Sequence, residues 1–126
     1  MIVDTVNASP ALAAIMAAGP LTNIALALDP TLAGRIKMLY VMSSAVGVEG
    51  NVGNSGVGIE NEVAEWNIYA DPVVAAQVFK SGMPITLVPL DATRDAPVTH
   101  EFLGCLNAAR STPALNTVSD LMEASP

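Results

Sequence analysis

Short apolar runs that alternate with proline-opened helices constrain the fold of this chain most. Residues 11–18, 35–42 and 85–90 are each predicted to form a buried strand, because each run is short and bounded by turn residues. Alanine in residues 11–18 favours a helix, but the prolines on both sides favour a strand. Continuous apolar strands separated by helices predict an α/β fold with an open, mainly parallel sheet.

The helices are predicted from proline, glycine and capping residues. A proline suits the first turn of a helix, and an aspartate before it can cap the free N–H groups. The segments between helices and strands are predicted as turns and loops. Helices are predicted at residues 1–8, 20–28, 72–80, 99–109 and 113–123. With 126 residues, the chain is expected to form one partial domain, residues 1–126.

Charge and composition exclude several classes of protein. The net charge is −7 with only five scattered basic residues, which argues against nucleic-acid binding. No apolar run approaches the roughly 20 residues of a membrane span. The N-terminus shows no signal-peptide pattern, so a cytoplasmic location is expected. The single cysteine, Cys105, permits no internal disulfide and is predicted to lie on the buried face of a helix.

A long loop between residues 42 and 71 is the predicted functional segment. Loops of this length in a compact domain are usually functional or disordered. Disordered segments avoid aromatic and β-branched residues, whereas this loop carries Val63, Trp66 and Ile68. It leaves the carboxyl end of a predicted strand, where open parallel sheets bind ligands. We therefore predict a ligand-facing loop.

Glu65 and Asn67 are the polar pair that points to a ligand class. In an extended segment, residues two apart face the same way, with Trp66 on the other side. A carboxylate beside a carboxamide offers acceptors and donors for vicinal hydroxyls, as on a sugar. The alternative is that Asn67 and Asp71 cap the loop and Glu65 is solvated.

Other polar residues give weaker indications. The glycine-rich residues 50–54 lack the Lys-Ser or Lys-Thr pair of a P-loop. Glu60 and Glu62 are predicted to be solvent-facing charges. His100 precedes a predicted helix and is expected to cap it or to lie on the surface. The sequence shows no cluster of metal ligands.

Four motifs in order give a more specific indication. They are GPLTNIA at residues 19–25, VM at 41–42 with GN at 50–51, AEWN at 64–67 with DP at 71–72, and PITLVPLDAT at 84–93. This series resembles the inosine-uridine preferring nucleoside hydrolases over nearly all of the chain to about Leu103. The family hydrolyses the N-glycosidic bond of ribonucleosides, which releases base and ribose, with a bound calcium ion.

The resemblance implies roles for five residues. Asn51 and Glu65 would hold the ribose 5′-hydroxyl. Asn67 would hold a ring hydroxyl nearer the metal, and Met42 would pack against the sugar. The backbone carbonyl of Ala18 matches a position that binds calcium in the family.

The sequence departs from the family pattern in three places. The N-terminal aspartate cluster, which supplies calcium ligands and the general base, has no counterpart here. The C-terminal His-Asp pair, which supplies an acid and another ligand, has none either. Ser43-Ser44 stands where the family usually has Gly-Gly after the methionine. We therefore expect a middle segment of such an enzyme that alone does not bind calcium tightly and has weak or no activity.

Two alternatives to the enzyme segment follow from the same residues. One is a non-catalytic module that binds sugars or nucleosides. The other is a structural remnant that associates with a full-length relative through exposed sheet edges. A sheet with open edges also predicts marginal stability and self-association into a homo-oligomer.

Overall fold

The computed structural model describes residues 1–124, which fall into two compact units. The first is Met1–Asp95, and the second lies within Ala96–Pro126. The expectation of one domain over residues 1–126 stays a prediction. Within residues 1–124, no helix is long and apolar enough to cross a membrane.

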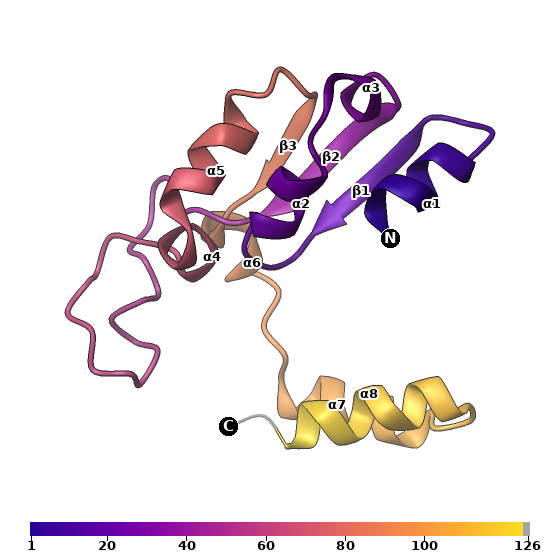
Figure 1. Ribbon diagram of the computed structural model, residues 1–126. Coiled ribbons are helices and arrows are strands. Elements are labelled where there is room, and N and C mark those ends of the chain that lie inside the picture. Colours follow the sequence, from indigo (N-terminus) through magenta and orange to yellow (C-terminus); the bar gives the residue numbers. More distant parts are fainter. Residues whose placement is uncertain (125–126) are drawn as a thin grey trace. The chain divides into compact units, whose positions relative to one another are not determined.

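The first unit carries a three-stranded sheet and six helices (Figure 1). The strands lie in the order β1-β2-β3, and both pairs are parallel. This confirms the predicted open parallel sheet. The elements are α1 Ile2–Ala8, β1 Ala13–Ala17, α2 Thr22–Ala27, α3 Pro30–Ala33, β2 Ile36–Met42, α4 Trp66–Ala70, α5 Pro72–Phe79, β3 Ile85–Val88 and α6 Leu90–Thr93.

The core lies on one face of this sheet. Leu39 and Val41 of β2 are completely buried there, together with Leu21 before α2 and Val78 of α5. Alternate residues of the strands face the other way, and Met16 of β1 is 79% exposed. The buried core is aliphatic and contains no aromatic side chain within the described residues.

Capping explains where the main helices begin and end. Asp71 caps α5 by accepting the N–H of Val74, with Pro72 at the first helical position. Gly82, with φ of +78°, follows the helix in a left-handed conformation that suits glycine. These features confirm the predicted start and stop of α5.

Three short helices lie where the sequence pattern indicated loop, turn or strand end. These are α3, α4 and α6, each of four or five residues. A single turn contains too few residues to show helical periodicity. The side chains of Asp29 and Glu65 nevertheless cap α3 and α4 by accepting backbone N–H groups.

The second unit is a pair of helices, α7 His100–Ala108 and α8 Pro113–Glu123. Thr99 and Thr112 cap them. Asn107 of α7 hydrogen bonds to Ser119 and Glu123 of α8, which ties the two helices together. The predicted helices at residues 99–109 and 113–123 are confirmed.

Cys105 is exposed, so its predicted core position is wrong. The physical reason is that α7 has no buried residue. Its apolar residues are spaced as on a buried helix face, but the helix pair is too small to bury that face.

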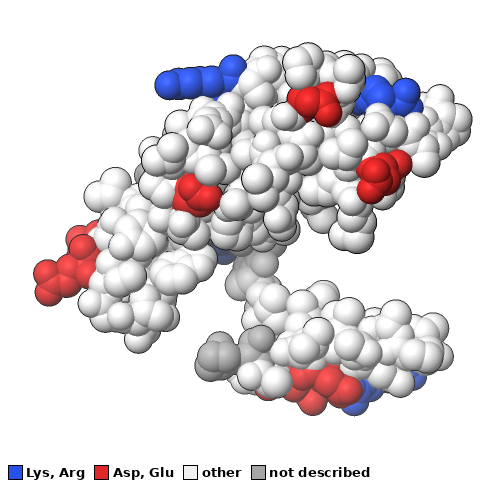
Figure 2. All heavy atoms as spheres, viewed as in Figure 1, with Lys and Arg blue, Asp and Glu red and all other residues white. Residues whose placement is uncertain are grey.

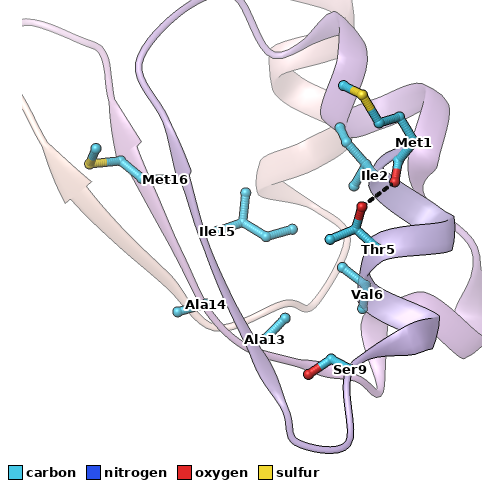
Figure 3. A pocket seen from close by; sticks show the side chains of 9 residues that line it. All are labelled: Met1, Ile2, Thr5, Val6, Ser9, Ala13, Ala14, Ile15 and Met16. Atoms are coloured by element: carbon cyan, nitrogen blue, oxygen red, sulfur yellow. Dashed lines mark hydrogen bonds between the residues drawn. The ribbon is translucent and has the colours of Figure 1, made fainter. Parts of the chain in front are cut away.

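An apolar groove of about 440 Å³ runs between α1 and β1 (Figure 3). Ala13 and Ile15 point toward α1, whereas Met16 points away from the groove. The guanidinium of Arg35 holds the end of α1 nearby by donating to the carbonyls of Val6 and Ser9. Along the described chain, β1 pairs only with β2, so its outer edge is open.

We predict that Leu39→Ala destabilises the first unit by about 2–5 kcal/mol, because the change removes a fully buried side chain and leaves a cavity. That is a large part of the roughly 5–15 kcal/mol that stabilises a domain. Chemical unfolding measures it, with Leu26→Ala as the control, since Leu26 is 82% exposed. Equal losses in both variants would contradict the packing described above.

Candidate functional site

The candidate site lies at the carboxyl end of β2. The chain leaves β2 at Met42, makes a long loop and returns through α4 to α5 (Figure 1). The first residues of the loop lie between α4 and the end of β3. The polar residues singled out from the sequence belong to this region.

Glu65 is buried, with 2% of its surface exposed. Its Oε1 accepts the N–H of Asn67 at 2.9 Å, and its Oε2 accepts the N–H groups of Ser44 at 3.0 Å and Ile68 at 3.1 Å. A buried carboxylate needs such partners, and N–H bonds to a charged acceptor are among the stronger hydrogen bonds. Glu65 therefore caps α4 and fastens the strand end to it.

The extended conformation predicted for residues 65–67 is wrong, because Glu65 caps a helix that begins at Trp66. The alternative of a solvated Glu65 is also wrong, since the residue is buried. The helix forms because the Glu65 side chain satisfies two N–H groups of its first turn. The capping role predicted for Asp71 is confirmed.

Asn67 connects α4 to β2. Its Nδ2 donates to the carbonyl of Met42 at 2.9 Å and lies 3.5 Å from the Met42 sulfur. Asn67 is 9% exposed, so this bond lies at the margin of the core. Its side chain is not a cap, in contrast to the alternative drawn from the sequence.

Asn51 connects the outgoing arm of the loop to α4. Its Oδ1 accepts the N–H of Trp66 at 2.7 Å, and its own N–H donates to the carbonyl of Ala64 at 3.0 Å. The preceding Gly50 has no room for a side chain, because a Cβ there would lie 2.1 Å from the Ala64 oxygen. Glycine thus allows the two arms of the loop to approach and sets the position of Asn51.

A second set of contacts comes from α6. Asp91 accepts the N–H of Val46 at 3.0 Å and that of Gly47 at 2.7 Å. These bonds, first that of Val46, hold the pKa of Asp91 below its usual range. Arg94 donates to the carbonyl of Glu49 at 2.7 Å. Asp91 directly follows the strand predicted at residues 85–90, but no sequence pattern indicated this role, because it depends on contact between segments about 45 residues apart.

Ser43 and Ser44 have unusual environments for serine. Ser43 is completely buried, and its hydroxyl has no hydrogen-bond partner among residues 1–124. Ser44 has a φ of +74°, the only positive φ of a non-glycine residue in the described chain. The left-handed region costs such a residue roughly 1–2 kcal/mol.

The structure links four of the predicted site residues by hydrogen bonds, and the fifth, Ala18, follows the neighbouring strand. Hydrogen bonds link Glu65 and Asn67 to each other, Asn67 to Met42, and Asn51 to Trp66 in the same short helix. Ala18 directly follows β1, whose last residue, Ala17, pairs with Val41 of β2, so Ala18 lies at the sheet edge where Met42 ends β2. Glu60, Glu62 and His100 are exposed, as predicted.

The described residues do not by themselves fit a calcium ion. Calcium takes about 6–8 oxygen ligands, but residues 1–124 hold no group of three or more acidic, histidine or cysteine side chains that could bind a metal. The carboxylates near the loop also accept protein donors already: Glu65 and Asp91 bind backbone N–H groups, and Asp71 binds the Thr22 hydroxyl. The carbonyl of Ala18 alone is not a site.

Comparisons with known proteins identify the family that the sequence motifs indicated. The family model of the inosine-uridine preferring nucleoside hydrolases matches residues 1–125. A pyrimidine-specific ribonucleoside hydrolase (RihA) of Shewanella woodyi is 37% identical over 120 residues, 94% of this chain. A non-specific ribonucleoside hydrolase (RihC) of Escherichia fergusonii is 37% identical over 96% of the chain. The chain spans 35% and 36% of the length of these two relatives.

Solved structures share the fold. An inosine-uridine preferring nucleoside hydrolase of Bacillus anthracis matches with a TM-score of 0.76 at 26% identity, over 94% of this chain and 39% of that one. A plant nucleoside hydrolase matches with a TM-score of 0.73 at 35% identity, over 87% of this chain and 33% of that one. The loop and sheet described above therefore correspond to about a third of each longer protein.

We predict that the loop contacts of Asp91 are lost in acid. Because hydrogen bonds stabilise its ionised form, the folded-state pKa lies below the unperturbed value of about 3.9. The stability from these bonds is then complete above that value and falls as the pH drops through the folded-state pKa. Titration of the Val46 and Gly47 amide NMR signals should show a midpoint below about 3.9, which Asp91→Asn abolishes. A midpoint at or above that value in the wild type would contradict the contact.

Proposed function

Because the chain belongs to the inosine-uridine preferring nucleoside hydrolase family, we propose that it forms the ribose-binding part of a ribonucleoside hydrolase. Met42, Asn51, Glu65 and Asn67 are the residues that would contact the sugar. The observation that carries this proposal is the hydrogen-bond network that holds these four at the carboxyl end of β2. Open parallel sheets bind their ligands at this edge.

Hydrogen-bonding capacity remains in this network for a sugar. Neither the Asn51 Nδ2 nor the Asn67 Oδ1 has a partner within residues 1–124. A carboxylate has about four lone-pair sites, and Glu65 uses three of them for backbone N–H groups. Sugar hydroxyls both donate and accept, so they complement this mixture. Met42 is half-buried and supplies apolar surface for the carbon side of the ring.

Hydrolysis of a nucleoside requires catalytic groups in addition to residues that bind the sugar. Cleavage of a glycosidic bond passes through an oxocarbenium-like transition state and requires an activated water. The Glu65 carboxylate is buried and bonded to three N–H groups, so it is poorly placed to accept a proton from water. We therefore propose that this chain alone binds ribose or ribonucleosides with weak or no turnover.

The substrate class is ribonucleosides, with the base left open. The two relatives at 37% identity are a pyrimidine-specific and a non-specific hydrolase by their names, so identity favours neither preference. On the face of the first unit shown in Figure 2, the Lys and Arg side chains lie apart rather than in a cluster. The absence of a nucleic-acid partner, expected from the net charge of −7, stays a prediction. The cytoplasmic location stays a prediction.

We predict that the chain binds D-ribose and does not release base from inosine or uridine, with or without added calcium. Trp66 is the only tryptophan and lies within the site, so its fluorescence reports binding. Asn67→Ala should weaken binding by about tenfold, a loss of about 1.4 kcal/mol. Asn54→Ala is the control, because Asn54 is exposed on the loop tip. Calcium-dependent base release that disappears in Glu65→Ala and Asn67→Ala would overturn the prediction of weak turnover.

The open edge of β1 supports a further proposal, that the chain self-associates. We infer that this edge pairs with the same edge of a second copy. Its sequence, AAIMA, contains no charge or proline, the features that usually protect an edge strand. No charged side chain lines the adjacent groove either. With a net charge of −7 on each copy, an uncharged edge is where two copies meet with least repulsion.

We predict that Met16→Lys shifts the chain from dimer toward monomer, since a lysine on an edge strand opposes pairing. Leu26→Lys adds the same charge at a position that is also highly exposed, in α2, and should leave the dimer intact. Sedimentation velocity measures the distribution. A monodisperse wild-type monomer would contradict the proposal, and a wild-type chain that pairs only with a full-length relative would favour the structural remnant.

A further inference from the structure

The loop segment that leads to Asn51 is held by α6 rather than by burial. Val46 is 73% exposed and Val48 is 36% exposed, so apolar packing does not fix this stretch. Its backbone is instead bonded to two side chains, one from a residue of α6 and one from the C-cap residue of that helix. We name Asp91 and Arg94 the α6 clasp.

The clasp bonds two nearby stretches of backbone, residues 46–47 and residues 49–50. The Asp91 carboxylate accepts the N–H groups of Val46 and Gly47 at 3.0 and 2.7 Å. The Arg94 guanidinium donates to the carbonyl of Glu49 at 2.7 Å and lies 3.5 Å from that of Gly50. The carboxylate therefore accepts backbone N–H groups, and the guanidinium donates to backbone carbonyls. Each of the two side chains is complementary to the backbone groups that it contacts.

Asn51 follows this segment directly. Its side chain accepts the N–H of Trp66. The backbone bonds of Gly50 to Glu62 and of Asn51 to Ala64 hold Asn51 on the return arm of the loop, and the clasp holds the residues that lead to it. Asp91 and Arg94 lie on an element that continues from β3 and is anchored by the buried Leu90. Because α6 is held against the sheet by Leu90, it can fix the position of a loop segment that has few packing contacts of its own.

We propose that Asp91 and Arg94 are positioning residues, which hold Asn51 against α4 and so set the geometry of the ribose site. The effect on ribose rests on the function proposed above, whereas the effect on Asn51 does not. A ligand that meets a pre-ordered Asn51 avoids the cost of ordering the loop, so the clasp raises affinity without touching the sugar.

The experiment compares Asp91→Ala with Asp29→Ala. The two aspartates are matched, because each carboxylate accepts two backbone N–H groups, those of Thr31 and Leu32 in the case of Asp29. Hydrogen exchange of the Trp66 amide reports the bond to Asn51, and Trp66 fluorescence gives the Kd for D-ribose. We expect Asp91→Ala to speed Trp66 exchange and to raise the Kd by about fivefold, with no change in Asp29→Ala.

A second pair keeps the test decisive if Asp91→Ala does not fold. Arg94→Gln should give the same direction of change as Asp91→Ala. Arg110→Gln removes the same charge in the second unit, where the arginine bonds to Asp120 and the carbonyl of Asn116, and should change nothing.

The outcomes separate the two proposals. Faster Trp66 exchange in the clasp variants, with no ribose binding by the wild type, supports the positioning of Asn51 and overturns the ribose site. Unchanged Trp66 exchange in folded Asp91→Ala or Arg94→Gln overturns the clasp. Unchanged ribose affinity in variants whose Trp66 exchange is faster overturns its effect on the site.

Discussion

The structure of the site depends on one buried carboxylate. Glu65 lies at the start of α4 and binds three backbone N–H groups, one of which comes from Ser44 just beyond β2. Burying a charge is costly unless its lone pairs are used, and here the backbone uses them. The same side chain therefore begins a helix and fastens that helix to the strand end. Asn67 adds a second tie between the same two elements.

Several acidic side chains of the first unit accept hydrogen bonds from backbone N–H groups. Asp29, Asp71 and Asp91 each accept N–H groups of a helix start or a loop, as Glu65 does. This explains how a chain with a net charge of −7 can lack a carboxylate cluster suited to a metal within residues 1–124. These four acids lie where the backbone has unpaired donors, at three helix starts and at the loop that Asp91 holds, whereas Glu60 and Glu62 are exposed.

The sequence predicted the sheet and the longer helices because those features have a local cause. Apolar runs bounded by prolines give strands, and Asp71-Pro72 gives a capped helix, whatever the rest of the chain does. The one-turn helices and the exposure of Cys105 were missed, because they depend on contacts absent from any local pattern. The four proposed site residues were singled out from ordered motifs and the family resemblance that these motifs carry. The bonds of Asn51 to Trp66 and of Asn67 to Met42, and the clasp of Asp91 on residues 46–47, join positions 15 to 45 residues apart.

The strained backbone of Ser44 follows from the same network. Its N–H donates to Glu65 and its carbonyl accepts the N–H of Leu90, so α4 and α6 both fix the orientation of one residue. A chain that leaves β2 and satisfies both partners takes a φ of +74° at this point, which is favourable for glycine and costly for serine. The family usually has glycine here, by the resemblance described above, and the geometry gives the reason. Serine is tolerated because the two hydrogen bonds over-determine the conformation, as strained residues at functional sites require.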